Sequence, residues 1–521
     1  MQIGRYELLT DEQEITSENI ISILQQVFPL HQSNAIEINS LLEFEAGNQP
    51  LQRIKKYRKD IDCKCVDNVA HEIAKFHIGY KWGIPITIVQ RGGKDSGNKS
   101  EVDAITLLNE QYEMQQIRKK TQKLARFVEI CGVGYTFVDV NSDYEDGDAY
   151  FNIEALDPRT TFVIRSSYYY DRRVMIGVTF RTDNKGNHYF TCFTKDGRYE
   201  IVNLTKITNG KKVTQKENWQ HQEQSGEKNP LGIIPIIEWI RNDDRMGCFE
   251  RQKDDLNNLN ILISDFTNDV EQNTQVIWHT VDVDFPIVTT ENEDGTTTET
   301  TKRPNSNEWL QTYSTSDGKS PKIAPLVVNY DYPGMLNNIV TRRALILQNA
   351  DVPQRNDNSG GSTGVAMDSA TGWSNAETVA MAQQNIMEGC KMEEVRVVLR
   401  AIQASSFVDA NNPLLSLKYR DCQPNIKRNK TYEMSTKANC FSTLVSHGIQ
   451  GYHALKVVNM FDDVNQVYAD SAGLIEKYQS SIFDKTTSNN AVGGDGELKP
   501  NADRTMQDLS DQKGNSPNMT V

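Results

Sequence analysis

The sequence lacks long apolar runs. No stretch approaches the roughly 18 consecutive apolar residues that a membrane-spanning helix requires, and no apolar leader segment opens the chain. We therefore expect a soluble protein that has no membrane partner. Hydrophobic residues make up only 37% of the 521 residues, and this polar balance favours an extended molecule with much surface over one large globule.

An excess of positive charge is also missing. Lys and Arg total 56 against 70 Asp and Glu, so the formal net charge is -14 at pH 7. A protein that holds nucleic acid tightly through its phosphates needs clustered Lys and Arg. The charge balance argues against such a protein, although it is compatible with a weak contact to nucleic acid.

The eight cysteines do not form the spaced framework that disulfide-rich secreted domains show. Their scatter favours free thiols in a reducing compartment. Cys63 and Cys65 are separated by one residue, which is too short for a usual zinc knuckle, and no second pair follows at knuckle distance. We interpret both as free thiols, and the sequence predicts no metal site and no cofactor.

Three patterns resemble catalytic motifs, and each lacks a necessary part. The loop 92–100 resembles a phosphate-binding loop, but Asn98 stands where the motif needs Lys directly after its last Gly. His71 and His77 are six residues apart, whereas a zinc-protease helix carries its histidines at i and i+4. The letters of a nucleophile elbow at 360–364 follow a polar loop instead of a buried strand. The sequence therefore predicts no catalytic residue.

The most informative stretch is a helical pattern over about 254–270, which follows an apolar, strand-like run from Ile233 to Ile240. Its apolar residues recur at steps of three and four and so share one stripe: Leu256, Leu259, Ile263, Phe266 and Val270. The other faces are polar and are expected to lie in water: Asp254, Asn257, Asn260, Asp265, Asn268 and Asp269. A narrow apolar stripe favours packing against similar helices, and an ordinary amphipathic helix on a globular core is the alternative.

Two acidic residues of this helix, Asp265 and Asp269, lie four positions apart on one face. A metal-binding or catalytic pair is possible at this spacing. A solvated helix face is the favoured interpretation.

The N-terminal part of the chain predicts an α+β fold. Helical patterns cover four segments: 17–30, 41–47, 60–82 and 101–131. Between Gly132 and Val202 the apolar period changes to two, and Asp-Gly and Asn-Lys-Gly turns separate the predicted strands.

The C-terminal part mixes one β-rich insert with helices. The insert spans 276–333, and a second helix covers about 334–350. A Gly/Ser/Asn loop then leads to a long helix over about 374–407, where Ser374 and Glu377 have the spacing of a capping box. A helical unit at 431–482 follows, and the apolar-poor tail 486–521 is predicted to be disordered.

Four stretches, in this order, resemble the portal proteins of tailed bacteriophages, of the type found in long-tailed phages of Gram-positive hosts. The first combines an aromatic-and-Gly step, an Asn-bearing helix and a GYxxGxPI entry to a strand; the others are two Gly-bearing strand entries and a Ser-Thr-Gly loop before the long helix. They lie at 42–47 with Asn68 and 79–86, at 130–138 with 156–164, at 231–238 and at 362–367. No single stretch is specific, but their common order across about residues 40–400 is.

The resemblance implies a ring of about twelve identical subunits, each with a wing, a two-helix stem, a β-rich clip, a tunnel loop and a helical crown. The implied segments are wing 1–245 and 374–430, first stem helix 246–275, clip 276–333, second stem helix 334–350, tunnel-loop region 351–373, crown 431–485 and disordered tail 486–521. The apolar stripe would pack the stem as cyclic symmetry repeats one contact until the ring closes. Asp265 and Asp269 would be channel-facing acids that repel DNA phosphates.

The resemblance also implies a role and partners. The protein would be a non-enzymatic channel at one capsid vertex of the virion, assembled in the host cytoplasm, through which double-stranded DNA is packaged and ejected. Its expected partners are the terminase large subunit, the scaffold and major capsid proteins, and the head–tail connector proteins.

The implied tunnel loop carries the residues expected next to DNA: Gln354, Arg355, Asn356, Asp357, Asn358, Ser359, Gly360 and Gly361. Arg355 is the one cation among them, and one Arg per subunit around a ring gives a weak, sequence-blind contact with the DNA backbone. The alternative is that Arg355 pairs with Asp351 or Asp357.

Three other interpretations compete with a portal protein. Another connector or minor head protein of a virion would lack a β insert between two stem helices. A nucleotide-dependent enzyme would have to use the loop 92–100. The third is an unrelated α+β protein whose resemblance is accidental.

Overall fold

The computed structural model has an α+β fold and divides into two compact units, Met1–Asn429 and Lys430–Val521. The structure describes residues 4–51, 60–91, 99–204, 206–208, 211–213, 218–223, 225–274, 277–281, 283–284, 287–291, 297–301, 313–314, 322–326, 331–354, 372–428, 434–458, 467–468 and 471–478.

The largest sheet of the first unit has seven strands and is covered by helix α1 (Ile20–Glu45). Phe28 of α1 stands edge-on to Phe190 of the sheet, with ring centroids 5.0 Å apart, and both side chains are buried. The strands are β1 (Leu9–Thr10), β5 (Thr161–Ser166), β6 (Val174–Thr182), β7 (His188–Phe193), β8 (Gly197–Asn203), β11 (Trp219–His221) and β12 (Glu227–Lys228), in the order β1-β5-β6-β7-β8-β11 with β12 also on β8. A separate hairpin joins β9 (Lys206–Thr208) to β10 (Lys211–Val213).

A second sheet has the order β13-β3-β4 and lies against helices α4 and α8. Its buried cluster joins Val138 and Trp239 of the sheet to Val398 of α8. The members are β3 (Val133–Val140), β4 (Phe151–Leu156), β13 (Ile236–Ile240), α4 (Ile117–Cys131) and α8 (Trp373–Ala404).

Late parts of the chain return to early ones in this unit. β20 (Cys422–Asn425) pairs antiparallel with β2 (Thr87–Gln90), beside α3 (Lys99–Met114). The unit therefore contains both the N-terminal region and the region that follows the long helix. Helix α2 (Val69–Trp82) and the short helices η2 (Glu250–Gln252), η3 (Pro413–Ser416) and η4 (Tyr419–Asp421) complete it.

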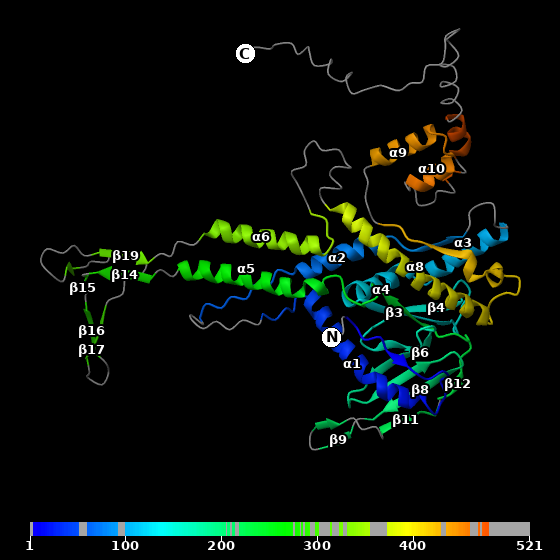
Figure 1. Cartoon of the computed structure of the whole chain (residues 1–521), viewed down its shortest axis with the longest axis horizontal. Helices are drawn as coiled ribbons and strands as arrows, with labels where there is room; N and C mark the ends of the chain where they lie inside the picture. Colours follow the sequence, from blue (N-terminus) through cyan, green and yellow to red (C-terminus); the bar gives the residue numbers. More distant parts are fainter. Residues whose placement is uncertain are drawn as a thin grey trace, which may run out of the picture. The chain divides into compact units, whose positions relative to one another are not determined.

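Two helices, α5 (Lys253–Thr274) and α6 (Tyr332–Asn349), lie side by side and run antiparallel (Figure 1). The described residues of the segment between them form three two-stranded ladders. The pairs are β14 (Ile277–Val281) with β19 (Lys322–Leu326), β15 (Val283–Asp284) with β18 (Tyr313–Ser314), and β16 (Ile287–Glu291) with β17 (Thr297–Thr301).

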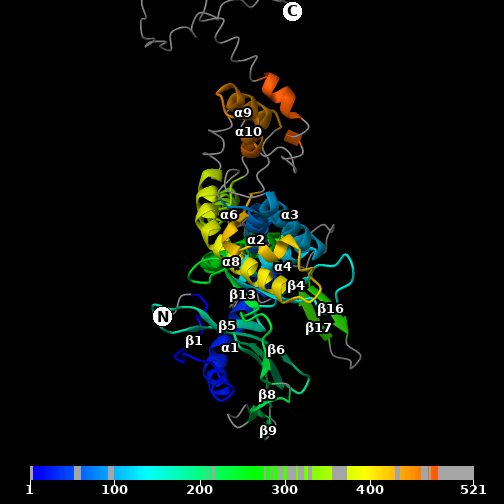
Figure 2. The same cartoon turned by 90° about the vertical axis from the view of Figure 1, so that its right-hand side faces the viewer.

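The second unit is helical in its described part. Helices α9 (Met434–Ser446) and α10 (Gly451–Val458) pack together, as Figure 2 shows. Their contact buries Val445, Ala454 and Leu455.

Two predicted helix boundaries are wrong near the N-terminus. The structure has one helix, α1, where the sequence predicts two, because its buried side continues from Val27 and Phe28 past Pro29 to His31. Helix α2 begins at Val69 instead of residue 60, since the preceding segment is extended and forms other hydrogen bonds.

Two more predictions fail at helix ends. The helix predicted over 101–131 is broken into α3 and α4 at Gln116, whose φ of 52° lies in the left-handed region. The predicted capping box is absent, because Gly372 is the N-cap residue of α8 and Ser374 lies inside the first turn. No helix in the described part of the chain is both long and apolar enough to cross a bilayer.

Candidate functional site: the paired helices and their anchorage

The apolar stripe of α5 is buried at its beginning and exposed at its end. Leu256 and Leu259 are buried in one cluster with Ile346 and Leu347 of α6. Further along α5, Ile263 packs against the same cluster and Phe266 is half-buried. Val270, at the far end of the stripe, is exposed. The stripe therefore joins α5 to its own chain mainly over the first three turns.

Contacts at both ends of the helix pair fix its antiparallel arrangement. The ring of Phe266 stands edge-on to Tyr332 at the start of α6, with centroids 5.9 Å apart. At the other end, the Gln252 amide donates to the Asn349 carbonyl at 3.1 Å. These contacts span α6 from Tyr332 to Asn349 and reach along α5 as far as Phe266.

A row of small polar side chains on α5 is buried, contrary to the sequence prediction that Asn260 and Asn268 lie in water. Asn260, Ser264 and Asn268 are each at most 1% exposed. They bond to an extended segment, residues 61–67, which we call the strap. The N–H groups of Cys63, Cys65 and Asp67 donate to Asn268, Ser264 and Asn260 at 2.7, 3.0 and 2.9 Å.

The match between helix and strap has a simple geometric cause. Four residues of α-helix rise about 6 Å, and two residues of extended chain rise about 6.6 Å. Side chains at every fourth helix position can therefore meet every second residue of an antiparallel strap. Each contact also satisfies a backbone group that would otherwise be buried without a partner.

Further polar contacts hold the two ends of this row. The Asn260 amide donates to Gln49 at 2.6 Å, and Asn268 donates to the Cys63 carbonyl at 3.2 Å. Arg343 of α6 lies 2.9 Å from the Asp67 carboxylate and 2.5 Å from that of Glu72. The strap is thus joined to both helices.

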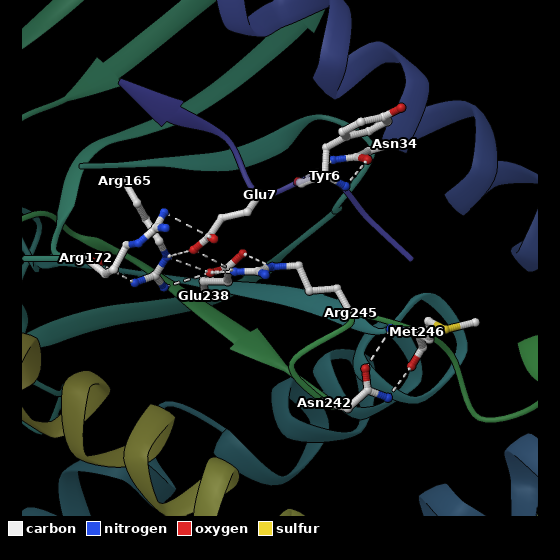
Figure 3. Close-up of polar contacts among 9 residues, drawn as sticks. All are labelled: Tyr6, Glu7, Asn34, Arg165, Arg172, Glu238, Asn242, Arg245 and Met246. Atoms are coloured by element: carbon white, nitrogen blue, oxygen red, sulfur yellow. Dashed lines mark hydrogen bonds and ion pairs between the residues drawn. The ribbon is translucent and has the colours of Figure 1, made fainter. Parts of the chain in front are cut away.

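The segment that leads from β13 into α5 is fixed by a buried carboxylate, Glu238 (Figure 3). Arg165 and Arg245 lie 2.7 and 3.3 Å from it, and Glu7 lies 3.6 Å from Arg245. Burial alone would raise the pKa of Glu238, but Arg245 and Arg165 outweigh it and hold that pKa below its usual range. The Glu238 carboxylate therefore stays ionised in the strand that precedes α5.

The turn after β13 depends on backbone geometry. Asn242 exchanges two hydrogen bonds with Met246, at 2.9 and 3.0 Å (Figure 3), and Arg245 adopts a φ of 55°. Gly132, with a φ of 78°, lies against this turn, where a Cβ atom would come within 2.2 Å of the Arg245 carbonyl oxygen. Only glycine fits this approach without a shift of the backbone.

A second buried charge cluster lies near the end of α6. The Lys81 ammonium is 2.9 Å from Glu129, which also accepts from Arg241 and Trp82 at 3.0 Å. Burial acts to raise the pKa of Glu129, but Lys81 and Arg241 outweigh it and lower that pKa. The backbone N–H of Cys248 donates to the Glu129 carbonyl at 2.7 Å, so the same residue also holds the approach to α5.

His77 of α2 ties the end of α6 to this cluster. Its Nε2 lies 2.8 Å from the carbonyl of Ala350, which can only accept, so Nε2 carries the proton. Burial, with the nearby Lys81 cation, lowers the pKa of His77 to about 3. The imidazole is therefore neutral, and its Nε2 is committed to the Ala350 carbonyl. His71 lies 2.7 Å from the Glu45 carboxylate, so the two histidines have separate partners.

Both ends of the predicted tunnel loop are anchored. On one side Asp351 accepts from Asn375 at 2.7 Å, and on the other the Trp373 ring lies 5.6 Å from that of Tyr80. Gln354 is half-buried. The other predicted DNA-contact residues lie outside the described residues: Arg355, Asn356, Asp357, Asn358, Ser359, Gly360 and Gly361.

Of the remaining sequence-predicted sites, some lie within the described residues and others lie outside them. Asp265 and Asp269 are half-buried on α5. Of the loop predicted at 92–100, residues 92–98 lie outside the described residues and residues 99–100 begin α3. The elbow-like residues 360–364 and the tail 486–521 also lie outside the described residues. Among the residues that the structure describes, no group of three or more His, Cys, Asp or Glu side chains is arranged to hold a metal ion.

Sequence reasoning missed the polar row and the strap. The signal available was the spacing of Asn260, Ser264 and Asn268 at i, i+4 and i+8, which marks a second stripe on α5 as regular as the apolar one.

Comparison with known proteins connects this architecture to a family. The model of the family described as phage portal protein, SPP1 Gp6-like, matches residues 41–479. No curated protein matches the sequence. The matched region includes both paired helices, the insert between them, the strap and the long helix α8. Since it covers well over half of the chain, the protein belongs to the SPP1 Gp6-like family of phage portal proteins, a family of structural proteins and not of enzymes.

Proposed function

We propose that this protein forms a ring-shaped channel at one vertex of a bacteriophage capsid, through which double-stranded DNA is packaged and later ejected. The observation that carries the proposal is an antiparallel helix pair with a β-rich insert, in a chain of the portal family. In this assignment α5 and α6 form the stem, the insert is the clip, and the unit that begins at Lys430 contains the crown.

Exposed apolar side chains on α6 support assembly into a ring. Leu336 is 52% exposed and Val340 is 57% exposed, one helical turn apart, and Leu345 is also exposed. Val270 near the end of α5 is exposed as well. In a ring of about twelve subunits, each copy would cover these side chains on its neighbour, and cyclic closure would leave none of them at a free end.

The acidic stem and the tunnel loop would have opposite effects on DNA. Asp265 and Asp269 repel phosphates if they face the channel, which limits sticking of the DNA. Arg355 supplies one cation per subunit for a weak contact with the backbone. The balance of repulsion and weak contact suits a channel that lets DNA slide.

The remaining partners follow from the proposed place at the vertex. The terminase large subunit would dock during packaging and supply the ATP hydrolysis, and head–tail connector proteins would replace it. Scaffold and major capsid proteins would contact the ring during assembly in the host cytoplasm.

Native mass spectrometry of the purified full chain, with negative-stain images of the same sample, tests the proposal. A closed ring near twelve subunits with a central hole is the expected result. A chain that stays monomeric or dimeric with scaffold protein present, across salt and protein concentration, would contradict the ring. Turnover of ATP by the chain alone, lost on Lys99→Ala, would favour the nucleotide-dependent enzyme instead.

A further inference from the structure

Two cysteine sulfurs meet on the strap. The Sγ atoms of Cys63 and Cys65 are 3.6 Å apart, and both side chains are half-buried. Alternate residues of an extended chain point to the same side, so the strap conformation itself brings the two thiols together. Lys64 between them keeps its side chain half exposed.

Hydrogen bonds to side chains of α5 fix the backbone of both cysteines. The N–H and the carbonyl of Cys63 both bond to Asn268, and the N–H of Cys65 donates to Ser264. The backbone on either side of Lys64 is therefore fixed, while both cysteines stay partly exposed. The Cys65 sulfur also lies 3.6 Å from the Thr267 hydroxyl.

The other six cysteines are placed differently. Cys131, Cys192, Cys248 and Cys422 are buried, and Cys390 is half-buried in α8. Burial raises the pKa of Cys248 to about 12 and that of Cys390 to about 11, so these thiols stay protonated and inert. Cys440 is exposed, but it belongs to the second unit.

We propose that Cys63 and Cys65 form a dithiol site that low-molecular-weight disulfides oxidise to an internal disulfide, and that this modification loosens the strap from α5. The proposal does not depend on ring formation. It concerns chemistry that the single chain already positions.

The oxidation proceeds in two balanced exchange steps. One of the two thiols loses its proton to solvent, and its thiolate attacks one sulfur of the small disulfide, forms a mixed disulfide and expels one small thiolate. The second thiol then loses its proton and attacks the protein sulfur of the mixed disulfide, which forms the internal bond and expels the second small thiolate. Two protein thiols are oxidised, and one small disulfide is reduced to two thiols.

The hydrogen bond between the two groups affects their ionisation. That bond, together with the charge of Cys65, raises the pKa of the Cys63 thiol. The two thiols titrate as a pair, so either can be the first nucleophile while the other acts as the resolving thiol.

Closing the disulfide must disturb the polar row. A disulfide bond is about 2.05 Å long, so the sulfurs must approach by roughly 1.5 Å from their present separation. The bond ties the side chains of residues 63 and 65, whose backbone groups are the ones held by Asn268 and Ser264. We expect these hydrogen bonds to weaken and the strap to open more often.

Peptide mapping with oxidised glutathione as the probe tests the site on the full chain. Trypsin cuts after Lys64 and so separates Cys63 on peptide 60–64 from Cys65 on peptide 65–75. After oxidation, alkylation of remaining thiols and digestion, we expect the two peptides to be joined, at a mass two hydrogens below their sum. The proposal would be overturned if both peptides carried glutathione adducts and no joined pair formed at any ratio of oxidised to reduced glutathione.

Matched variants separate this site from general thiol reactivity. Cys440→Ser should leave the joined pair unchanged, whereas Cys63→Ser should abolish it and leave a stable glutathione adduct on Cys65. Hydrogen exchange reports the link to the stem: we expect strap amides to exchange at least about fivefold faster after oxidation, with no such change in Cys63→Ser. Equal exchange before and after oxidation would overturn that link.

Discussion

The two paired helices differ in what they bury. Helix α5 turns a row of polar side chains, Asn260 to Asn268, inward against the strap, and its own chain satisfies them. Helix α6 leaves apolar side chains such as Leu336 and Val340 exposed. Both helices also bury apolar side chains, such as Leu259 and Leu347, so these two rows are exceptions to the usual rule that apolar groups lie inside and polar groups outside. The difference supports the proposal that α5 is held mainly by its own chain, whereas a neighbouring copy would cover the exposed apolar side chains of α6.

The largest effect is expected from breaking the α6 surface. The double variant Leu336→Asp, Val340→Asp places two charges where the proposed neighbour would pack, so native mass spectrometry should show single subunits in place of rings. Burying unpaired charges is costly, whereas both side chains are exposed in one chain, so the melting temperature of the subunit should hardly change.

The matched control for this variant is Ile36→Asp, an equally apolar residue of α1 that is 72% exposed. It should leave ring formation intact. Loss of rings in the control as well would show that any exposed charge prevents assembly and would remove the special role of α6.

The next largest effect is expected inside α5. Asn260→Leu removes the partner of the Asp67 N–H and of Gln49 and leaves both buried groups without a hydrogen bond. We expect a loss of about 2–4 kcal/mol in the free energy of unfolding, measured by urea titration in the assembly-deficient double variant. Asn258→Leu, at an exposed position two residues earlier, should change it by less than about 0.5 kcal/mol.

Acid should weaken the junction at the end of α6 by a smaller amount. Burial lowers the pKa of His77 to about 3, below its ordinary value of 6.5, so between these limits the unfolded chain takes up a proton that the folded chain does not. Stability is therefore present above pH 6.5 and is lost as the pH falls. From pH 6.5 to pH 5 the loss from this residue is about 2 kcal/mol.

The variant His77→Gln isolates this contribution, since glutamine keeps an N–H for the Ala350 carbonyl. Its urea-unfolding free energy should fall less between pH 6.5 and pH 5 than that of the parent. Some acid sensitivity should remain in the variant, because both proteins keep a second buried histidine, His31, whose pKa burial lowers to about 4. His453→Gln, at an exposed site, should follow the parent. An unchanged pH dependence in His77→Gln would place the acid sensitivity elsewhere.

The smallest effect concerns the polar face of α5. If Asp265 and Asp269 face the channel, Asp265→Asn with Asp269→Asn should make purified rings retain double-stranded DNA about two- to fivefold better at low salt. The gain should vanish near 0.5 M salt, where charges are screened. The same change at the exposed pair Asp254 and Asp255 is the control, and an equal gain there would point to overall charge instead.

Local patterns in the sequence were enough to predict much of the architecture. The apolar stripe predicts α5, and the change of period after it predicts strands before α6, because each pattern depends only on residues a few positions apart. The structure has helices and strand ladders at these places.

Contacts between distant segments could not be predicted in this way. Nothing near Asn260 shows that the strap lies against it, so the residue was expected in water. The continuation of α1 through Pro29 likewise depends on a sheet more than a hundred residues later, whose Phe190 packs on Phe28. For Arg355 and its neighbours, the sequence gives a cation in a Gly-bearing loop, and their contact with DNA stays a prediction.

The strap also sets an order of events during synthesis. Its bonds to α5 join residues 193 to 205 positions apart in the chain. At about 5–20 residues per second, a ribosome makes the strap roughly 10–40 s before the helix that receives it. Until then the strap's N–H groups have only water to bind, and α5 has no partner for its inner row. A nascent chain interrupted before α5 therefore has a strap without its partner helix, and the helix pair is complete only once the chain has reached Asn349 at the end of α6.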